Sequence, residues 1–491
     1  MSILIVVNNP KDWPLAMEGV EVVAARSYLS EKRYGQMQRA RVFNLCRSYR
    51  YQATGYYVSL LAEARGHKPL PDIATIQDLK SQPDIRIVSG EIDEIIQKSL
   101  HPLKSAEFVL SVYFGQNVAK RYETLSQQLF NLFQAPLLRA FFVHHDKEDR
   151  WLLKSIHPIA AREIPGDHYD FVVEAARAFF ARRQPLIRRR SRYRYDLAIL
   201  HDPHEKEAPS NTRALKKIIK AAESVGFETE LIHKDDYGRL AEFDALFIRE
   251  TTNVNHHTYR FARRAAILGL VVVDDPLSIL KCTNKVFLAE LLEKNHIRIP
   301  RTRIVDRESR RQVVEEVGLP CILKQPDSSF SQGVVKVETK EEMQRELCRL
   351  LERSDLVIAQ EFLPTAFDWR VGIFDGYPLF VCKYFMAEKH WQIIRRDSPD
   401  AKPEYGYFET LPVEFAPKEL IKLAVRAARL IGNGLYGLDI KQKGNRYYVI
   451  EINDNPNLDA GVEDAVLKDE LYLRIARVFM RRVEQAKSGG R

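Results

Sequence analysis

Cysteine is scarce in this chain, and the few copies are not arranged for cross-linking or metal binding. The 491 residues include five cysteines, at positions 46, 282, 321, 348 and 382, and no two of them form a Cys-x-x-Cys pair. An odd and scattered set of this kind favours reduced thiols in a cytoplasm over a disulfide framework or a zinc site. We therefore expect a cytoplasmic protein whose fold does not depend on disulfide bonds.

Long hydrophobic runs are also missing. No apolar stretch approaches the about 20 residues that span a bilayer, and residues 1–7 are too short, and lack the basic flank, to be a secretory signal. We expect no membrane partner. The chain has no internal repeat and no long low-complexity tract, while a 45% hydrophobic composition over this length is enough for two or three separate cores.

Oxygen-bearing side chains gather in a predicted β-hairpin near the C-terminus. Asp439 lies in one apolar strand, Glu451 and Asn453 lie in the next, and Lys443-Gly444-Asn445 supplies the turn. If those three residues form the loop, 439 pairs with 449, and all three side chains lie on one face. Such hard oxygen ligands suit Mg²⁺, which completes its shell with water and phosphate and so implies a nucleotide. A hairpin with a merely solvated polar face is the alternative.

A possible phosphate cradle lies upstream. Residues 322–324 predict a short strand ending in Lys324, and a loop with Ser328, Ser329 and Gly333 leads into a second strand. Hydroxyl groups, free backbone N–H groups and a lysine together can bind an anion, although the loop is no Walker A match. Lys285 precedes an amphipathic segment and is a further candidate. The alternatives are an ordinary strand connection and a solvent-exposed lysine.

Two further strands carry candidate binding residues. Residues 356–363 predict an apolar strand that includes Gln360 and Glu361, where backbone groups could bind an adenine and Glu361 the ribose hydroxyls; a plain surface glutamate is the alternative. Asp-Gly at 375–376 predicts a hairpin whose first strand carries Arg370. That arginine could hold a phosphate or a substrate carboxylate in bidentate fashion. A surface ion pair with Asp368 is the alternative.

Taken in this order, the motifs resemble those of the ATP-grasp ligases, and Asp368-x-Arg370 and Glu451-x-Asn453 look like the RimK-type branch. The resemblance covers about residues 195 to 485. It implies an ATP-grasp fold of α/β and α+β class, with an α/β pre-grasp lobe, a lid subdomain and a C-terminal antiparallel-sheet lobe. It also implies the binding roles: Lys285 and Lys324 contact ATP phosphates, the strand end with Glu361 binds adenosine, and Asp439, Glu451 and Asn453 hold two Mg²⁺ ions, with Mn²⁺ as a substitute.

The sequence also predicts how the chain is divided. Strands at 197–200, 245–248 and 270–273 alternate with helices at 212–225 and 259–268, as the pre-grasp lobe requires. The first 180 residues mix strands and helices of their own. Their segment 41–57, dense in arginine and tyrosine, is similar to the N-terminal domain that precedes some RimK-like ATP-grasp proteins. We expect that domain at 1–181, a basic linker at 182–195, the pre-grasp lobe at 196–280 and the lid and catalytic lobes at 281–485.

The resemblance implies an ADP-forming carboxylate-amine ligase that activates a carboxylate as an acyl phosphate. Lys324 and Arg370 are the predicted catalytic residues. Predicted substrate contacts are Arg249, Arg370, Lys383 and Asn457. The basic residues Arg249, Arg370 and Lys383, together with His390, Arg395 and Arg396, favour an acidic substrate such as glutamate, and the alternative is that several of them only face solvent. After Asn453, residues 454–461 are bulkier and more acidic than in RimK-type proteins. This leaves the acceptor least defined, although an acidic loop favours an ammonium group.

The remaining expectations concern partners. The net charge of +9 allows steering of acidic substrates, but no groove-reading motif accompanies it, so nucleic acid is not favoured. We expect amino acid or peptide substrates, with an acidic protein tail as a further candidate, and a homo-oligomer. Two alternatives stay open: a nucleotide-gated binding protein for an acidic protein tail or nucleic acid, and a phosphotransferase without ligation.

Overall fold

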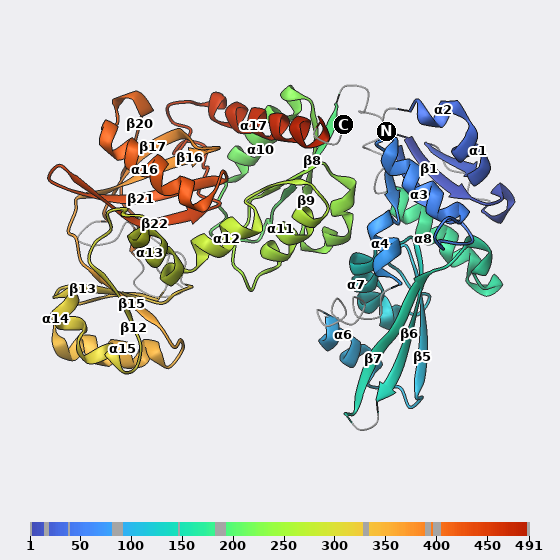
Figure 1. The fold of residues 1–491 in the computed structure, drawn as a ribbon, viewed down its shortest axis with the longest axis horizontal. Helices are drawn as coiled ribbons and strands as arrows, with labels where there is room; N and C mark the ends of the chain where they lie inside the picture. The colour runs from blue at the N-terminus through green and yellow to red at the C-terminus, as the bar shows by residue number, and fades with distance from the viewer. Residues whose placement is uncertain are drawn as a thin grey trace. The chain divides into compact units, whose positions relative to one another are not determined.

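The computed structural model describes residues 2–13, 19–37, 40–80, 92–145, 148–181, 193–327, 333–387, 394–395 and 404–488. The chain divides into two compact units (Figure 1). The first contains residues 1–192 and 235–242, and the second contains residues 193–234 and 243–491. The finer domain boundaries given above stay a prediction.

The first unit contains two sheets. A parallel sheet has the order β2-β1-β3-β4, and an antiparallel sheet has the order β5-β6-β7. The strands are β1 (Ser2–Val7), β2 (Val20–Ala24), β3 (Ala40–Asn44), β4 (Lys68–Leu70), β5 (Glu107–Tyr113), β6 (Leu137–His145) and β7 (Arg150–Pro158). The helices are α1 (Ala25–Ser30), α2 (Lys32–Gly35), α3 (Thr54–Ala64), α4 (Ile73–Asp78), α6 (Asp93–Leu100), α7 (Glu123–Phe133) and α8 (Tyr169–Ala181). The buried strand β1 supplies core residues to both faces of the parallel sheet.

The second unit begins with the predicted α/β lobe. Its parallel sheet has the order β11-β10-β8-β9. The strands are β8 (Tyr195–Leu200), β9 (Phe227–Ile232), β10 (Ala245–Ile248) and β11 (Val271–Val273), and the helices are α10 (Thr212–Val225), α11 (His257–Ile267) and α12 (Pro276–Thr283). Helix α10 begins where the Asn211 side chain accepts a hydrogen bond from the Ala214 N–H, and it ends at Gly226, whose φ of 108° only glycine adopts readily. Its apolar face packs with α17 (Asp469–Ser488).

The lid follows as a four-stranded antiparallel sheet of order β12-β15-β13-β14. Its strands are β12 (Thr302–Val305), β13 (Cys321–Lys324), β14 (Val334–Val337) and β15 (Val357–Glu361), and its helices are α14 (Val313–Val317) and α15 (Lys340–Leu351). A capping box between Thr339 and Glu342 starts α15, which buries Met343 and Leu347 in the lid core. Helix α13 (Lys285–Lys294) precedes this sheet in the chain.

The C-terminal lobe is built on a five-stranded antiparallel sheet of order β20-β17-β16-β21-β22. Its strands are β16 (Phe367–Phe374), β17 (Tyr377–Phe385), β20 (Phe408–Leu411), β21 (Leu435–Lys443) and β22 (Arg446–Asp454), with the short pair β18 (Ile394–Arg395) and β19 (Glu404–Tyr405) nearby in sequence. One face of the sheet packs with α16 (Lys418–Ile431) in a core that includes Trp369, Val371 and Ile440. The opposite face carries Asp368, Arg370 and Asp439, as the strand register requires.

The register of the β21–β22 hairpin differs from the prediction. Lys443 pairs with Arg446, so the turn has two residues and not three, and Gly444 has the positive φ of 60° that such a turn favours. A bulge at Ile450 then adds a residue to β22, and Asp439 pairs with Glu451 rather than with Val449. The two shifts together keep Asp439, Glu451 and Asn453 on one face, which confirms that part of the prediction.

Among the residues that the structure describes, no helix is both long and apolar enough to cross a bilayer. The 20-residue helix α17 is long enough but carries charged side chains along its length.

Candidate active site

Arg370 and Asp439 form the centre of the candidate site. They lie opposite one another on β16 and β21, with Arg370 Nε 2.5 Å from Asp439 Oδ1 and Arg370 Nη2 3.0 Å from Asp439 Oδ2. Each side chain is only 15% exposed, so this bidentate ion pair is largely shielded from water. Asp368 pairs instead with Lys441, at 2.6 Å between Oδ1 and Nζ. The alternative of a surface pair between Asp368 and Arg370 is therefore wrong.

The second carboxylate of the site is Glu451, on β22, the strand that pairs with β21. Glu451 faces Asp439, and Lys285 Nζ approaches Glu451 Oε1 to 2.8 Å. The Asn453 amide donates to Asp439 Oδ2 at 3.2 Å. Burial raises the pKa of Glu451, but the charges of Lys285 and Lys324 outweigh burial, and the net pKa lies below its ordinary value. Glu451 is therefore a charged carboxylate at neutral pH.

The donor set fits a hard divalent cation. Burial raises the pKa of Asp439, and the charge of Arg370 opposes that shift. No cluster of three or more His, Cys, Asp or Glu side chains with metal-binding geometry occurs in the described parts of the chain. Asp439, Glu451 and Asn453 provide two carboxylates and one carboxamide, a set that suits Mg²⁺ with water and phosphate as its other ligands.

The lid contributes a buried lysine. Lys324, at the end of β13, is 8% exposed, and its Nζ donates to Gln360 Oε1 at 2.9 Å. Gln360 is in turn held by Thr302, whose Oγ1 accepts from Gln360 Nε2 at 3.0 Å. Burial lowers the pKa of Lys324 to about 8, Lys285 acts in the same direction and Glu451 opposes both. A poorly solvated ammonium group of this kind gains from an anionic ligand such as a phosphate.

The other predicted nucleotide contacts are placed as follows. Gly333 has a φ of 75°, a backbone conformation that favours glycine. Glu361 Oε2 lies 3.1 Å from Arg301 Nε at the end of β15. Ser328 and Ser329 lie outside the described residues. The roles of these residues toward a nucleotide stay predictions.

The affinity for ATP should fall as the pH rises through about 8, because Lys324 then loses its charge. We expect a weakening of about tenfold between neutral and alkaline solution, the size of one charge-assisted hydrogen bond. Titration of a fluorescent ATP analogue at a series of pH values measures this. Lys324→Met should bind weakly at every pH, while Lys422→Met, an exposed lysine paired with Glu419, should behave as the wild type. A pH-independent affinity in the wild type would contradict the role of Lys324.

Two predicted substrate residues are corrected by the structure. Lys383 pairs with Trp369, so it lies on the opposite face of the sheet from Arg370, and its Nζ is 2.9 Å from Glu409 Oε2. Lys383 lies on this opposite face because β17 has a bulge at Leu379: Gly372 pairs with Phe380, while Ile373 pairs with Pro378. In a regular hairpin Lys383 would have shared the face of Arg370.

The second correction concerns Arg249, which is fully buried. Its guanidinium donates to the carbonyl oxygens of Pro209 and Pro456, to Ser210 Oγ at 3.0 Å and to Asn455 Oδ1 at 2.5 Å. With these partners the buried guanidinium fixes the start of the loop after β22. Asn457 lies in that loop, with its Nδ2 3.3 Å from Asp459 Oδ2. His390 and Arg396 lie outside the described residues, as does the side chain of Arg395.

Residues 454–464, which we call the acceptor loop, contain functional candidates that sequence reasoning missed. Lys217 Nζ lies 2.6 Å from Asp464 Oδ2, and the Asn211 N–H donates to Asp459 Oδ1 at 2.7 Å. Two acidic side chains of the loop, Asp459 and Asp464, therefore contact the pre-grasp lobe. Glu463 is buried and accepts a hydrogen bond from the hydroxyl of Tyr384. No short-range sequence signal links Glu463 to β17, because the two residues lie 79 positions apart.

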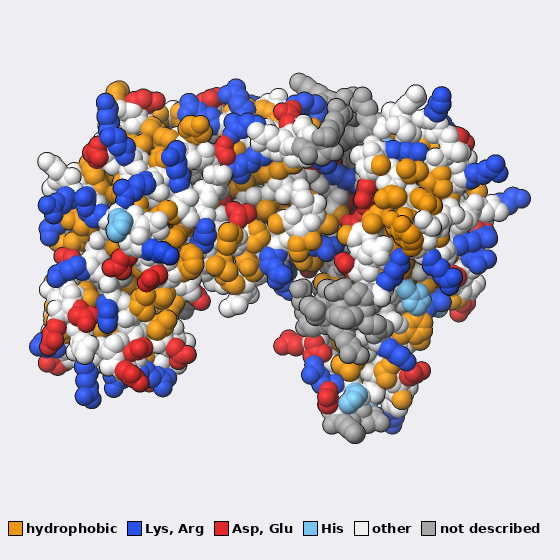
Figure 2. Space-filling view, viewed as in Figure 1, with side chains coloured by type: hydrophobic (Ala, Val, Ile, Leu, Met, Phe, Trp, Pro, Cys, Tyr) orange, Lys and Arg blue, Asp and Glu red, His pale blue; other side chains and the backbone are white. Residues whose placement is uncertain are grey.

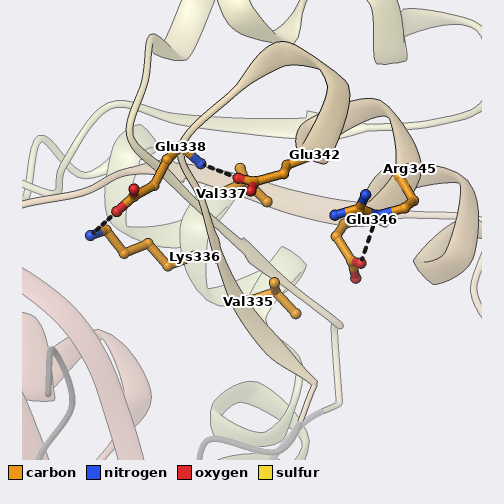
Figure 3. Close-up of a pocket in the computed structure, with 7 residues that line it drawn as sticks. All are labelled: Val335, Lys336, Val337, Glu338, Glu342, Arg345 and Glu346. Carbon is orange, nitrogen blue, oxygen red and sulfur yellow. Dashed lines mark hydrogen bonds and ion pairs between the residues drawn. The ribbon is translucent and has the colours of Figure 1, made fainter.

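Surface features elsewhere do not compete with this site. A shallow pocket in the lid is lined by Val335, Lys336, Val337, Glu338, Glu342, Arg345 and Glu346, and Figure 3 shows its charged groups bonded to one another. Lys336 pairs with Glu338 at 2.6 Å, and Glu342 accepts the Glu338 N–H at 2.9 Å. On the face seen in Figure 2, lysine and arginine side chains are interspersed with acidic and hydrophobic ones.

Two family models match separate parts of the chain. Residues 282–457 match the family model described as an ATP-grasp domain, so this part of the chain is an ATP-grasp domain. Residues 25–175 match the model described as a RimK-like ATPgrasp N-terminal domain. Together the two matches confirm the predicted ATP-grasp fold, the enzyme class and the N-terminal domain.

Curated relatives are distant but consistently named. A "Probable alpha-L-glutamate ligase" of Vibrio vulnificus strain YJ016 is 25% identical over 239 residues, covering 47% of this chain and 74% of the relative. A protein of the same name from Teredinibacter turnerae is 24% identical over 285 residues, covering 53% and 88% respectively. Among solved structures, D-alanine–D-alanine ligase from Bacillus anthracis matches with a TM-score of 0.48 and 15% identity, covering 60% of this chain and all (100%) of that one. A RimK domain protein ATP-grasp from Sphaerobacter thermophilus matches with a TM-score of 0.44 and 18% identity, covering 57% and 98%.

Proposed function

We propose that the protein is an ADP-forming carboxylate-amine ligase that works through an acyl-phosphate intermediate. The observation that supports this best is the alternation of charge across one buried surface: Lys285 beside Glu451, and Arg370 beside Asp439. A carboxylate is a poor electrophile, and transfer of the γ-phosphate of ATP gives it a leaving group. Preorganised cations around the transferred phosphate are the means by which such a step is accelerated.

Each residue has a proposed part in this reaction. Lys324 and Lys285 hold the ATP phosphates, and Arg370 steadies the acyl-phosphate oxygens. Asp439, Glu451 and Asn453 would hold two Mg²⁺ ions, which when bound offset charge on the γ-phosphate. Gln360 and Glu361 lie at the strand end proposed for the adenosine. A covalent enzyme intermediate is not needed, because the amine attacks the acyl phosphate directly.

We propose glutamate as one substrate. The support is the name shared by the curated relatives, together with the guanidinium of Arg370 on the site face. Arg249 and Lys383 no longer add to it, since neither reaches that face. The acceptor, the oligomeric state, the cytoplasmic location and the action on an acidic protein tail remain proposals. In the described parts of the chain, no contact favours the alternative of a nucleotide-gated binding protein.

A trapping screen tests this function. The protein is incubated with ATP, Mg²⁺ and hydroxylamine, with each standard amino acid in turn as donor, and ADP and hydroxamate are measured. Hydroxylamine reacts with any acyl phosphate that forms, so the acceptor need not be known. Glutamate should give hydroxamate and ADP in equal amounts. A response only to neutral or basic amino acids would overturn the glutamate assignment, and ADP without any hydroxamate would overturn the acyl-phosphate mechanism.

A further inference from the structure

Glu463 is a buried carboxyl group that the mechanism above does not use. It is 1% exposed and lies in the acceptor loop. Its Oε2 accepts the N–H of Asp459 at 2.7 Å, and its Oε1 accepts the hydroxyl of Tyr384. Burying a carboxylate is costly, and two hydrogen bonds offset only part of that cost. The position therefore calls for an explanation beyond packing.

Tyr384 connects this carboxyl group with the candidate active site. Tyr384 pairs with Asp368 across β16 and β17, so its ring lies on the same face as Arg370. The guanidinium carbon of Arg370 is 5.4 Å from the centre of that ring. Arg370 also forms the bidentate ion pair with Asp439. Contacts therefore connect Glu463, through Tyr384 and Arg370, with the proposed metal ligand Asp439. The bulge at Leu379 that turns Lys383 away from this face is also what brings Tyr384 onto it.

The proposed ligation step needs a proton acceptor. An acceptor amine must lose a proton as it attacks the acyl phosphate, and Asp439 and Glu451 are engaged by cations. We propose that Tyr384 and Glu463 form the proton relay for the acceptor amine. As the nitrogen bonds to the carbonyl carbon, its proton passes to the Tyr384 oxygen while the Tyr384 proton passes to Glu463 Oε1. The carbon–oxygen bond to phosphate then breaks, and phosphate leaves with the electron pair. This relay rests on the proposed ligase function.

The surroundings of Glu463 suit this role. Burial raises its pKa to about 7, while the Tyr384 hydroxyl and the Asp459 N–H oppose the shift. A base with a pKa near the working pH is the most effective one. Burial also raises the pKa of Tyr384, so the phenol stays neutral and can both accept and donate a proton. The titratable or charged groups that act on Glu463 come from several elements: Tyr384 and Cys382 of β17, Arg370 of β16, Asp459 of the acceptor loop, Tyr472 of α17, and Arg249.

The relay can be separated from a purely structural role by comparing two acceptors. Hydroxylamine is already unprotonated at neutral pH, and as a strong nucleophile it can attack first and release its proton to water afterwards, whereas an amino acid acceptor is an ammonium ion at neutral pH and depends on a base. In Tyr384→Phe and Glu463→Gln, amide formation with the amino acid should fall about 100-fold, while hydroxamate formation keeps the wild-type rate. The wild-type kcat for amide formation should rise through about pH 7, and Glu463→Gln should lose that ionisation.

The control is Tyr436→Phe, which removes another buried hydroxyl that contacts Ser278 and the Gly434 N–H. It should affect both acceptors alike. Equal loss of both reactions in Tyr384→Phe, or amide formation at the wild-type rate in both relay variants, would overturn the relay alone. A wild type that forms no hydroxamate with any donor would overturn the proposed function, and the relay with it.

Discussion

Asp439→Ala should lower ADP formation by about 10³-fold. The substitution removes a carboxylate from the proposed metal site and also leaves Arg370, buried and bidentate to Asp439, without its counter-charge. Asp439→Asn keeps the side-chain volume and should lose nearly as much activity, because the charge and not the shape is required. Coupled detection of ADP at several Mg²⁺ concentrations gives the measurement.

The control for this prediction is Glu419→Ala, on α16 of the same lobe, where the carboxylate is 72% exposed and pairs with Lys422. Such surface pairs contribute little, so wild-type turnover is expected. Glu451→Ala should resemble Asp439→Ala. Normal turnover by either variant at saturating Mg²⁺ would contradict the metal assignment.

Arg370→Lys should lower amide formation by about 100-fold while leaving the affinity for ATP nearly unchanged. A lysine keeps the positive charge but cannot reproduce two parallel N–H···O contacts, and the acyl-phosphate oxygens are expected to need that fork. Initial rates of ligation, compared with a nucleotide titration of the same sample, separate the two effects.

Lys383→Met is the matched control for Arg370→Lys. Lys383 lies on the neighbouring strand but on the opposite face, where it contacts Glu409. Ligation by this variant should stay close to that of the wild type. Equal loss of ligation and of ATP binding in Arg370→Lys would contradict the assignment of Arg370, and a large loss in Lys383→Met would restore Lys383 to the substrate site.

The strands of the site could be predicted from the sequence, but their exact pairing could not. The alternation of apolar and polar residues, together with turn-forming residues, predicted the strands β16, β17, β21 and β22. It also predicted that Asp439, Glu451 and Asn453 share one face. The pairing depends on two bulges, at Leu379 and Ile450, and an extra residue in a strand leaves no mark in a simple period of two. The bulge at Ile450 left Asp439, Glu451 and Asn453 on one face, because the turn between β21 and β22 was also one residue shorter than expected. The bulge at Leu379 is not offset by a change in its turn. It places Tyr384, and not Lys383, on the face that carries Arg370.

Contacts across long sequence separations set the other limit. Arg249 holds Asn455, which is 206 positions away, and Tyr384 holds Glu463. A basic residue next to a strand end looks the same in the sequence whether it faces a substrate or fastens a loop. Only the packing of the acceptor loop against the pre-grasp lobe shows that Arg249 does the second. In the lid, the contact between Lys324 and Gln360 is another of this kind, since the two residues lie 36 positions apart and meet because β13 pairs with β15.

The transfer of oxygen from the donor to phosphate tests the central claim most directly. Glutamate carrying isotopically heavy oxygen in its carboxylates is incubated with the protein, ATP, Mg²⁺ and hydroxylamine, and the released phosphate is analysed by mass spectrometry. If the carboxylate is activated as an acyl phosphate, one heavy oxygen leaves with each phosphate, because the bond that breaks lies between that oxygen and the carbonyl carbon. Phosphate without the label, released together with ADP, would show that the protein hydrolyses ATP without activating glutamate and would contradict the account.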